Sequence, residues 1–190
     1  MAGGSWSWII GMDGSTNYKE QLRYIDFSAA MGYQSVLVDA LWDKQIGRDK
    51  IEELAKYGKN KGVALYLWYN SNGYWNDAPQ TPRSIMDNAI ARRKEMKWMQ
   101  SIGIRGIKVD FFGGDKQMTM QLYEDILSDA NEYGLLVIFM DALCLVAGNV
   151  CILTSHRVRL YWLVKIFISL KAAVIMRPLM LPYIRLSVTR

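Results

Sequence analysis

Five apolar segments, separated by longer segments with helical periodicity, constrain the fold of residues 1–139 more than any other feature. The apolar segments are nearly continuous, as in strands that are buried on both faces. We expect strands at Trp6–Ile10, Ser35–Leu41, Val63–Tyr69, Ile104–Phe111 and Leu135–Phe139. We expect helices, the first N-capped by Thr16, at Asn17–Met31, Asp49–Tyr57, Ser84–Ser101 and Asp115–Tyr133. This alternation predicts an α/β fold with a parallel sheet covered by helices.

Polar side chains stand where three of the predicted strands end, at Asp39, Asn70 and Asp110. The (β/α)8 barrel and the doubly wound sheet both place active sites at the carboxyl ends of parallel strands, so the pattern fits either fold. The chain has no GxGxxG motif or P-loop after the first strand, which disfavours nucleotide binding. A complete barrel needs about 250 residues. The 190 residues of this chain can therefore hold only part of one.

Charge and cysteine usage separate residues 140–190 from the rest of the chain. Residues 1–139 carry 16 Lys and Arg against 17 Asp and Glu, whereas the tail carries seven against one, Asp141. The net charge of +5 thus comes from the tail, and we expect no nucleic-acid partner. Lys165 and Lys171 interrupt the apolar span Val158–Met176, so we expect no membrane partner either. No metal-ligand spacing links the remaining candidates, Cys144, Cys151 and His156.

Several long motifs between Ser5 and Phe139 resemble the catalytic domain of glycoside hydrolase family 97. They are SWSW, STNYKEQLRYIDFSAAMGY, VLVDALWD, LYLWYNSNGYWNDAPQTPR, ARRKEMKWM and GIKVDFFGGDKQ. The resemblance implies a (β/α)8 barrel that acts on α-galactosides or α-glucosides and carries a calcium ion. In the family this barrel lies between an N-terminal β-sandwich and a small C-terminal β domain. Residues 5–139 would then be the first half of the barrel, from its first strand to its fifth.

Asp110 is the strongest candidate for a catalytic residue. It ends an apolar strand, where a carboxylate has no packing role, and it matches the nucleophile of the family's retaining branch. A retaining glycosidase needs two carboxyl groups roughly 5 Å apart, one to attack the anomeric carbon and one to serve as acid and then base. Without the resemblance, the residue would be read as a helix cap or as the ion-pair partner of Lys108.

The family resemblance stops after Phe139, where a His-Gly-Cys motif is expected and MDALC follows instead. Codon arithmetic suggests a lost base near codon 139, because the shifted frame can encode HGCTLPRGWERMYPNF, EAVLASEN and AAFNATLHPFIRN in order. All three strings resemble the family downstream of its fifth strand. We therefore interpret residues 140–190 as an out-of-frame, irregular tail without a native fold. The restored residue at position 141 is glycine, which suits retention.

The shifted frame also removes two carboxylates that the resemblance implies. The acid/base glutamate falls at Lys165, and a calcium-binding glutamate falls at Arg159. Calcium needs several oxygen ligands. We therefore expect that this chain binds no calcium and does not turn over substrate, although the parent family does both.

Four residues on the predicted barrel rim are candidates for sugar contacts, namely Asp39, Lys108, Asn70 and Trp42. Further aromatic faces lie near the same rim, at Trp68, Tyr74 and Trp75, but Trp68 fits the core at least as well, and Trp6 and Trp8 fit barrel filling. The charged run Arg92–Lys97 is expected to be a solvated helix face.

The resulting hypothesis is a fragment of a hydrolase that cleaves terminal α-galactosides with retention. Two alternatives remain open: an α-glucosidase-type member of the same family, and a non-catalytic carbohydrate-binding fragment. The expected partner is an oligosaccharide or another α-glycoside, and the sequence does not fix the oligomeric state. The N-terminus shows no signal peptide. The localisation therefore stays open, while the family resemblance suggests a periplasmic or secreted parent enzyme.

Overall fold

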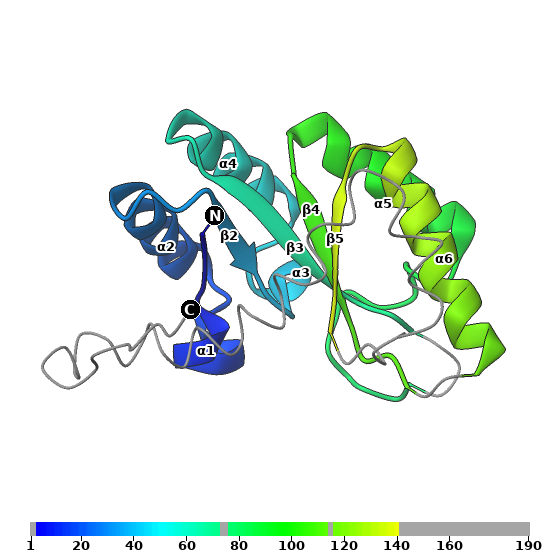
Figure 1. Ribbon diagram of the computed structural model, residues 1–190. Helices are drawn as coiled ribbons and strands as arrows, with labels where there is room; N and C mark the ends of the chain where they lie inside the picture. The colour runs from blue at the N-terminus through cyan, green and yellow to red at the C-terminus, as the bar shows by residue number, and fades with distance from the viewer. Residues whose placement is uncertain (1–2, 73–75, 114–115, 141–190) are drawn as a thin grey trace, which may run out of the picture. The chain divides into compact units, whose positions relative to one another are not determined.

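A computed structural model describes residues 3–72, 76–113 and 116–140, and within them one parallel sheet organises the chain (Figure 1). The tail at 141–190, with the predictions made for Asp141, Arg159 and Lys165, lies outside the described residues, as do Tyr74 and Trp75. The sheet has five strands in the order of the sequence. They are β1 (Gly4–Trp6), β2 (Ser35–Val38), β3 (Ala64–Asn70), β4 (Gly106–Asp110) and β5 (Leu136–Phe139). A doubly wound sheet reverses its strand order at a switch point. The uninterrupted order supports the first half of a (β/α)8 barrel.

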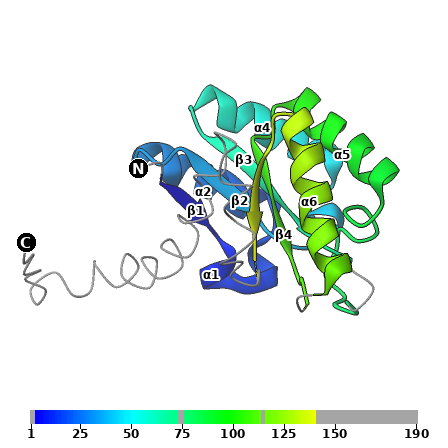
Figure 2. The same cartoon turned by 45° about the vertical axis from the view of Figure 1, so that its right-hand side comes forward.

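Helices connect successive strands and pack beside one another in chain order (Figures 1 and 2). The four long ones are α2 (Tyr18–Ala30), α4 (Arg48–Asn60), α5 (Ala89–Ile102) and α6 (Gln117–Glu132). Three short helical turns precede or follow them: α1 (Trp8–Gly11), η1 (Met12–Ser15) and α3 (Trp42–Gln45). The long helices and the sheet bury a shared apolar core that includes Ile25, Ile51, Leu54, Met96, Met99 and Ile126.

The start of the chain differs from the prediction of a strand at Trp6–Ile10. The strand β1 ends at Trp6, and Trp8–Gly11 forms α1 instead. The Ser7 carbonyl accepts hydrogen bonds from the amides of Ile10 and Gly11, which closes a helical turn. A short apolar run does not by itself distinguish a strand from a helical turn, so the run at Trp8–Gly11 misled the prediction.

The predicted N-cap of α2 was displaced by one residue. The cap is Asn17 rather than Thr16, because the Asn17 side chain accepts the Glu20 amide at 3.0 Å. This contact satisfies one of the free amides at the start of a helix.

Helix α5 carries a buried ion pair where the sequence predicted a solvated charged face. The Arg92 side chain is 3% exposed, and its Nη2 lies 2.6 Å from Oδ2 of Asp129 on α6. Arg92 also donates to the Met86 carbonyl at 2.7 Å. Glu95, one turn along α5, is buried as well and accepts the Tyr69 hydroxyl at 2.8 Å. The prediction for Arg92–Lys97 was therefore wrong at two positions, because tertiary partners bury these charges.

Gly106 lets β4 lie close to both of its neighbours. A Cβ atom at this position would approach the Leu136 carbonyl oxygen and the Tyr66 ring more closely than real atoms allow. We expect Gly106→Ala to lower the free energy of unfolding by about 1–3 kcal/mol, as overpacking usually does. Urea denaturation would measure the loss. The control is Gly14→Ala, where nothing lies within 4 Å of the added atom. Equal stability of the two variants would contradict this close packing.

Candidate active site

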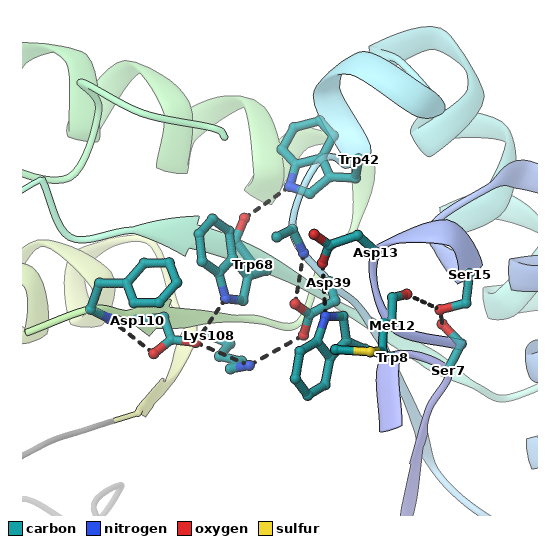
Figure 3. Close-up of polar contacts among 12 residues, drawn as sticks. Ser7, Trp8, Met12, Asp13, Ser15, Asp39, Trp42, Trp68, Lys108 and Asp110 are labelled. Carbon is teal, nitrogen blue, oxygen red and sulfur yellow. Dashed lines mark hydrogen bonds and ion pairs between the residues drawn. The ribbon is translucent and has the colours of Figure 1, made fainter. Parts of the chain in front are cut away.

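Two carboxylates and one ammonium meet at the carboxyl ends of β2 and β4 (Figure 3). The Lys108 Nζ lies 3.2 Å from Asp39 Oδ2 and 3.3 Å from Asp110 Oδ2. The Lys108 and Asp39 side chains are each 4% exposed, whereas the Asp110 side chain is 12% exposed. We call these three residues the carboxylate–lysine cluster. Its most accessible carboxylate is Asp110.

The strand register explains why residues so distant in sequence meet. Side chains alternate between the faces of a strand, so Lys108 and Asp110 share one face of β4. Lys108 pairs with Trp68 of β3, and Val38 at the end of β2 pairs with Leu67. Asp39, the residue after Val38, therefore lies level with Trp68 and Lys108. Of the three polar residues predicted at strand ends, Asp39 and Asp110 meet here through Lys108.

Asp110 is held by two hydrogen-bond donors and one ion pair. Its Oδ1 accepts the Phe111 amide at 2.9 Å, and its Oδ2 accepts the Trp68 indole N–H at 3.1 Å in addition to the Lys108 contact. Phe111 adopts a left-handed backbone with φ of 63°, which is uncommon for a bulky residue. Its ring packs edge-on against Trp68, with centroids 5.6 Å apart. The carboxylate is thus fixed at the rim by contacts on both β3 and β4.

Asp39 lies deeper than Asp110. Its Oδ1 accepts the Ala40 amide at 2.8 Å, and its other oxygen faces Lys108. Burial raises the pKa of Asp39 above its ordinary value, while the Lys108 ammonium, the Ala40 amide and the Trp6 side chain oppose that rise. The neighbours of Asp39 thus stabilise its charged form against the effect of burial.

Two tryptophans near the N-terminus complete the surroundings of the cluster. The Lys108 Nζ lies 4.1 Å from the centre of the Trp6 ring, within cation–π distance. Trp6 stacks on Trp8, with centroids 5.5 Å apart, and the Trp8 indole donates to Asp13 at 2.9 Å. Sequence reasoning left both tryptophans as barrel filling. The alternation in SWSW was the available signal, although Trp8 belongs to a helical turn rather than to the strand.

Two of the predicted sugar-contacting residues make contacts within the fold. Trp42 is 1% exposed, and its indole donates to the Trp68 carbonyl at 2.9 Å while its ring stacks on Trp98. Asn70 is fully buried and donates to the Ala78 and Gln80 carbonyls. In this structure Trp42 lies in the core beneath the rim, and Asn70 anchors the loop after β3. The polar pattern of that loop gave no sign of this use.

The described residues offer no grouping of three or more His, Cys, Asp or Glu side chains that could hold a metal ion. The two carboxylates of the cluster face an ammonium rather than each other, so they do not fit calcium, and we derive no step through that ion. No helix in the described part of the chain is long and apolar enough to cross a membrane.

Comparison with known proteins places the chain in one family. The model of the family described as Glycoside hydrolase 97 matches residues 2–144. Relatives include a "Probable retaining alpha-galactosidase" from Streptomyces bingchenggensis (strain BCW-1), 27% identical over 70% of this chain and 21% of that protein. Another is a "Retaining alpha-galactosidase" from Bacteroides thetaiotaomicron, 28% identical over 60% of this chain and 17% of that protein.

A crystal structure of a beta-arabinopyranosidase is similar at 62% identity and a TM-score of 0.70, over 72% of this chain and 22% of that one. The chain thus spans about a fifth of the length of the relatives it matches. The family match covers well over half of the chain and includes every strand of the described sheet. The chain belongs to glycoside hydrolase family 97.

Proposed function

We propose that this chain is part of a retaining glycosidase in which Asp110 is the nucleophile. The observation that carries the proposal is the position of Asp110, a fixed carboxylate at the carboxyl end of a barrel strand and the most exposed member of the carboxylate–lysine cluster. Barrel enzymes place their catalytic residues at this end of the strands. The names of the two relatives support retention.

In the proposed reaction an Asp110 oxygen attacks the anomeric carbon of the sugar. The bond from that carbon to the leaving oxygen breaks, and the leaving oxygen keeps the electron pair. It takes a proton from a general acid, and Asp110 becomes a neutral glycosyl ester that water later hydrolyses. The family's acid would fall at position 165, outside the described residues, where this chain has Lys165. We therefore propose that this chain does not turn over substrates whose leaving group must be protonated.

The proposed substrates are terminal glycosides with the ring configuration of galactose. Two relatives are named for α-galactosides and one similar structure for an arabinopyranoside. An α-D-galactopyranoside and a β-L-arabinopyranoside share the configuration of C1 to C4 and differ at C5, where only galactose carries a hydroxymethyl group. One site can thus bind both sugars if it binds the hydroxyls that they share. We propose that Asp39 and Lys108 bind those hydroxyls.

A glycosyl fluoride tests the nucleophile directly, because its fluoride leaves without protonation by a general acid. We expect 5-fluoro-α-D-galactopyranosyl fluoride to label the 190-residue chain once, because departure of fluoride needs no protonation. Intact-mass and peptide spectrometry would place the adduct on Asp110. Asp110→Asn is expected to abolish labelling, and Asp87→Asn, an exposed control, to retain it.

Competition between probes then separates the substrate classes. Faster labelling by the galactosyl or arabinopyranosyl fluoride supports the proposed ring configuration, whereas faster labelling by the glucosyl analogue supports the glucosidase alternative. Sugar binding without an adduct would contradict the nucleophile and favour a carbohydrate-binding fragment.

We further propose that the tail arises from a lost base near codon 139. Sequencing the source DNA across codons 130–200 tests this directly. An inserted base that restores the family motifs would identify a sequencing error, and the parent would then be a complete hydrolase. An unchanged read whose shifted frame continues into family sequence would identify a genuine deletion, and a read in which neither frame does so would refute the frameshift.

A further inference from the structure

The carboxylate–lysine cluster carries unequal charges, because one ammonium faces two carboxylates. We propose that Asp39 is a positioning residue that remains as the counterion of the Lys108 ammonium when Asp110 loses its negative charge in the glycosyl ester. The inference rests on the proposed function of Asp110. It assigns Asp39 a role that acts through Lys108, in addition to any contact with sugar.

The geometry leaves Lys108 dependent on these two partners. Its side chain is 4% exposed, and the Trp6 ring lies 4.1 Å from Nζ. Nζ donates a hydrogen bond to Asp39 at 3.2 Å and forms an ion pair with Asp110 at 3.3 Å, so the ammonium contacts both carboxylates. The other carboxylate nearby, Asp13, lies against the Trp8 indole. Asp39 and Asp110 are thus the charges that face Lys108 in the described residues.

The first chemical step would change this balance. With both carboxylates ionised, the cluster has a net charge of −1, which suits a transition state that gains positive charge on the sugar. Once Asp110 becomes an ester, it no longer carries a negative charge. A buried ammonium with no counterion is strongly unfavourable. Asp39 prevents this, because Lys108 and Asp39 remain as a neutral, hydrogen-bonded pair.

The two carboxylates have different surroundings, which suit Asp110 as the nucleophile and Asp39 as the counterion of Lys108. Asp39 is the less exposed of the two, and its second oxygen is held by the Ala40 amide. Asp110 lies nearer to solvent, where a sugar can reach it. A pair that is already in place needs no rearrangement while the ester forms.

The Asp110→Asn variant imitates the charge state of the glycosyl ester and allows a test without turnover. Carboxyl ¹³C resonances of labelled aspartates would be followed against pH in the full chain. We expect the titration midpoint of Asp39 to fall by about one pH unit in Asp110→Asn, because Lys108 then serves Asp39 alone and a like charge is gone. Asp87→Asn should leave it unchanged. An unchanged Asp39 midpoint in Asp110→Asn would overturn the proposal.

A double-mutant cycle gives a second readout. Asp39→Asn and Asp110→Asn each leave Lys108 with one counterion, whereas the double variant leaves it with none. We expect the double variant to unfold at a lower urea concentration than the two single losses predict together. Additive losses would contradict the shared ammonium, since residues without a common partner add independently.

Labelling kinetics connect the inference to the reaction. We expect Asp39→Asn to slow the labelling of Asp110 about 10-fold or more, the rate equivalent of one pKa unit, and labelling at the unaltered rate would refute the role of Asp39. If the unmodified chain takes up no label, the proposed function fails. The titration and the double-mutant cycle would still decide the inference in that case.

Discussion

Asp129→Asn is expected to lower the free energy of unfolding by about 3–5 kcal/mol, the usual effect of removing one partner of a buried ion pair. Arg92 donates from Nε to Asp129 Oδ2 at 2.6 Å, and its Nη2 lies 2.6 Å from the same atom. Both side chains are at most 3% exposed. An asparagine keeps the shape but leaves the guanidinium without a counterion. Urea denaturation followed by tryptophan fluorescence would measure the loss.

Two further variants separate the charge effect from a general loss of packing. Glu53→Gln removes a carboxylate of the exposed Lys50–Glu53 pair and should unfold like the unmodified chain. Arg92→Met combined with Asp129→Leu removes both charges and should recover stability relative to Asp129→Asn. If Asp129→Asn and Glu53→Gln changed the free energy of unfolding equally, the buried ion pair between α5 and α6 would not stabilise the fold as proposed.

Lys108→Met is expected to destabilise the chain strongly at neutral pH and much less in acid. The substitution leaves Asp39 and Asp110 side by side without the ammonium between them. At pH 7.5 we expect a loss of about 3–5 kcal/mol, as for other broken buried pairs.

The sign of the pH dependence follows from Asp39. Burial already raises the pKa of Asp39, and Lys108 is the strongest influence that lowers it, so the variant should raise the folded-state pKa further. For an acid with a raised folded-state pKa, stability is present below the unfolded pKa and is lost as the pH rises through the folded one. The difference between variant and unmodified chain should therefore shrink between pH 7.5 and pH 4.5.

A matched control for this prediction is Lys94→Met, which removes the same charge from an exposed position of α5. Urea denaturation at several pH values would compare the two. A pH-independent loss in Lys108→Met would show that packing of the lysine stem, rather than its charge, is what the cluster needs.

The sequence predicted the order of strands and helices because nearly continuous apolar strands and amphipathic helices leave clear periodic signals. It failed at Trp8–Gly11, where backbone contacts of Ser7 close a helical turn within an apolar run. It also failed at Arg92 and Glu95, since nothing in the local pattern reveals that Asp129 and Tyr69 will bury them.

For the candidate site, the sequence predicted the placement of some residues but not the contacts of others. The strand-end pattern placed Asp39 and Asp110 at one edge of the sheet, because it depends only on strand order, and Lys108 was proposed separately as a rim residue. Asn70 also stands at a strand end as predicted, but nothing in the sequence pattern shows that its amide donates to carbonyls of its own loop. The burial of Trp42 could not be predicted, because an aromatic residue near a rim points to solvent or to the core according to contacts that form only in three dimensions. Here α5 supplies Trp98 to stack on it.

The cluster joins parts of the chain that are far apart, because Asp39 and Lys108 are 69 positions apart in the sequence and Trp68 and Asp110 are 42 positions apart. Contacts of such long sequence separation carry a large loop-closure entropy and form slowly. Three strands and their crossover helices must be in place before the lysine can meet both carboxylates. The carboxylate–lysine cluster is therefore expected to form late in folding, so that substitutions within it alter mainly the rate of unfolding and leave the rate of folding almost unaffected.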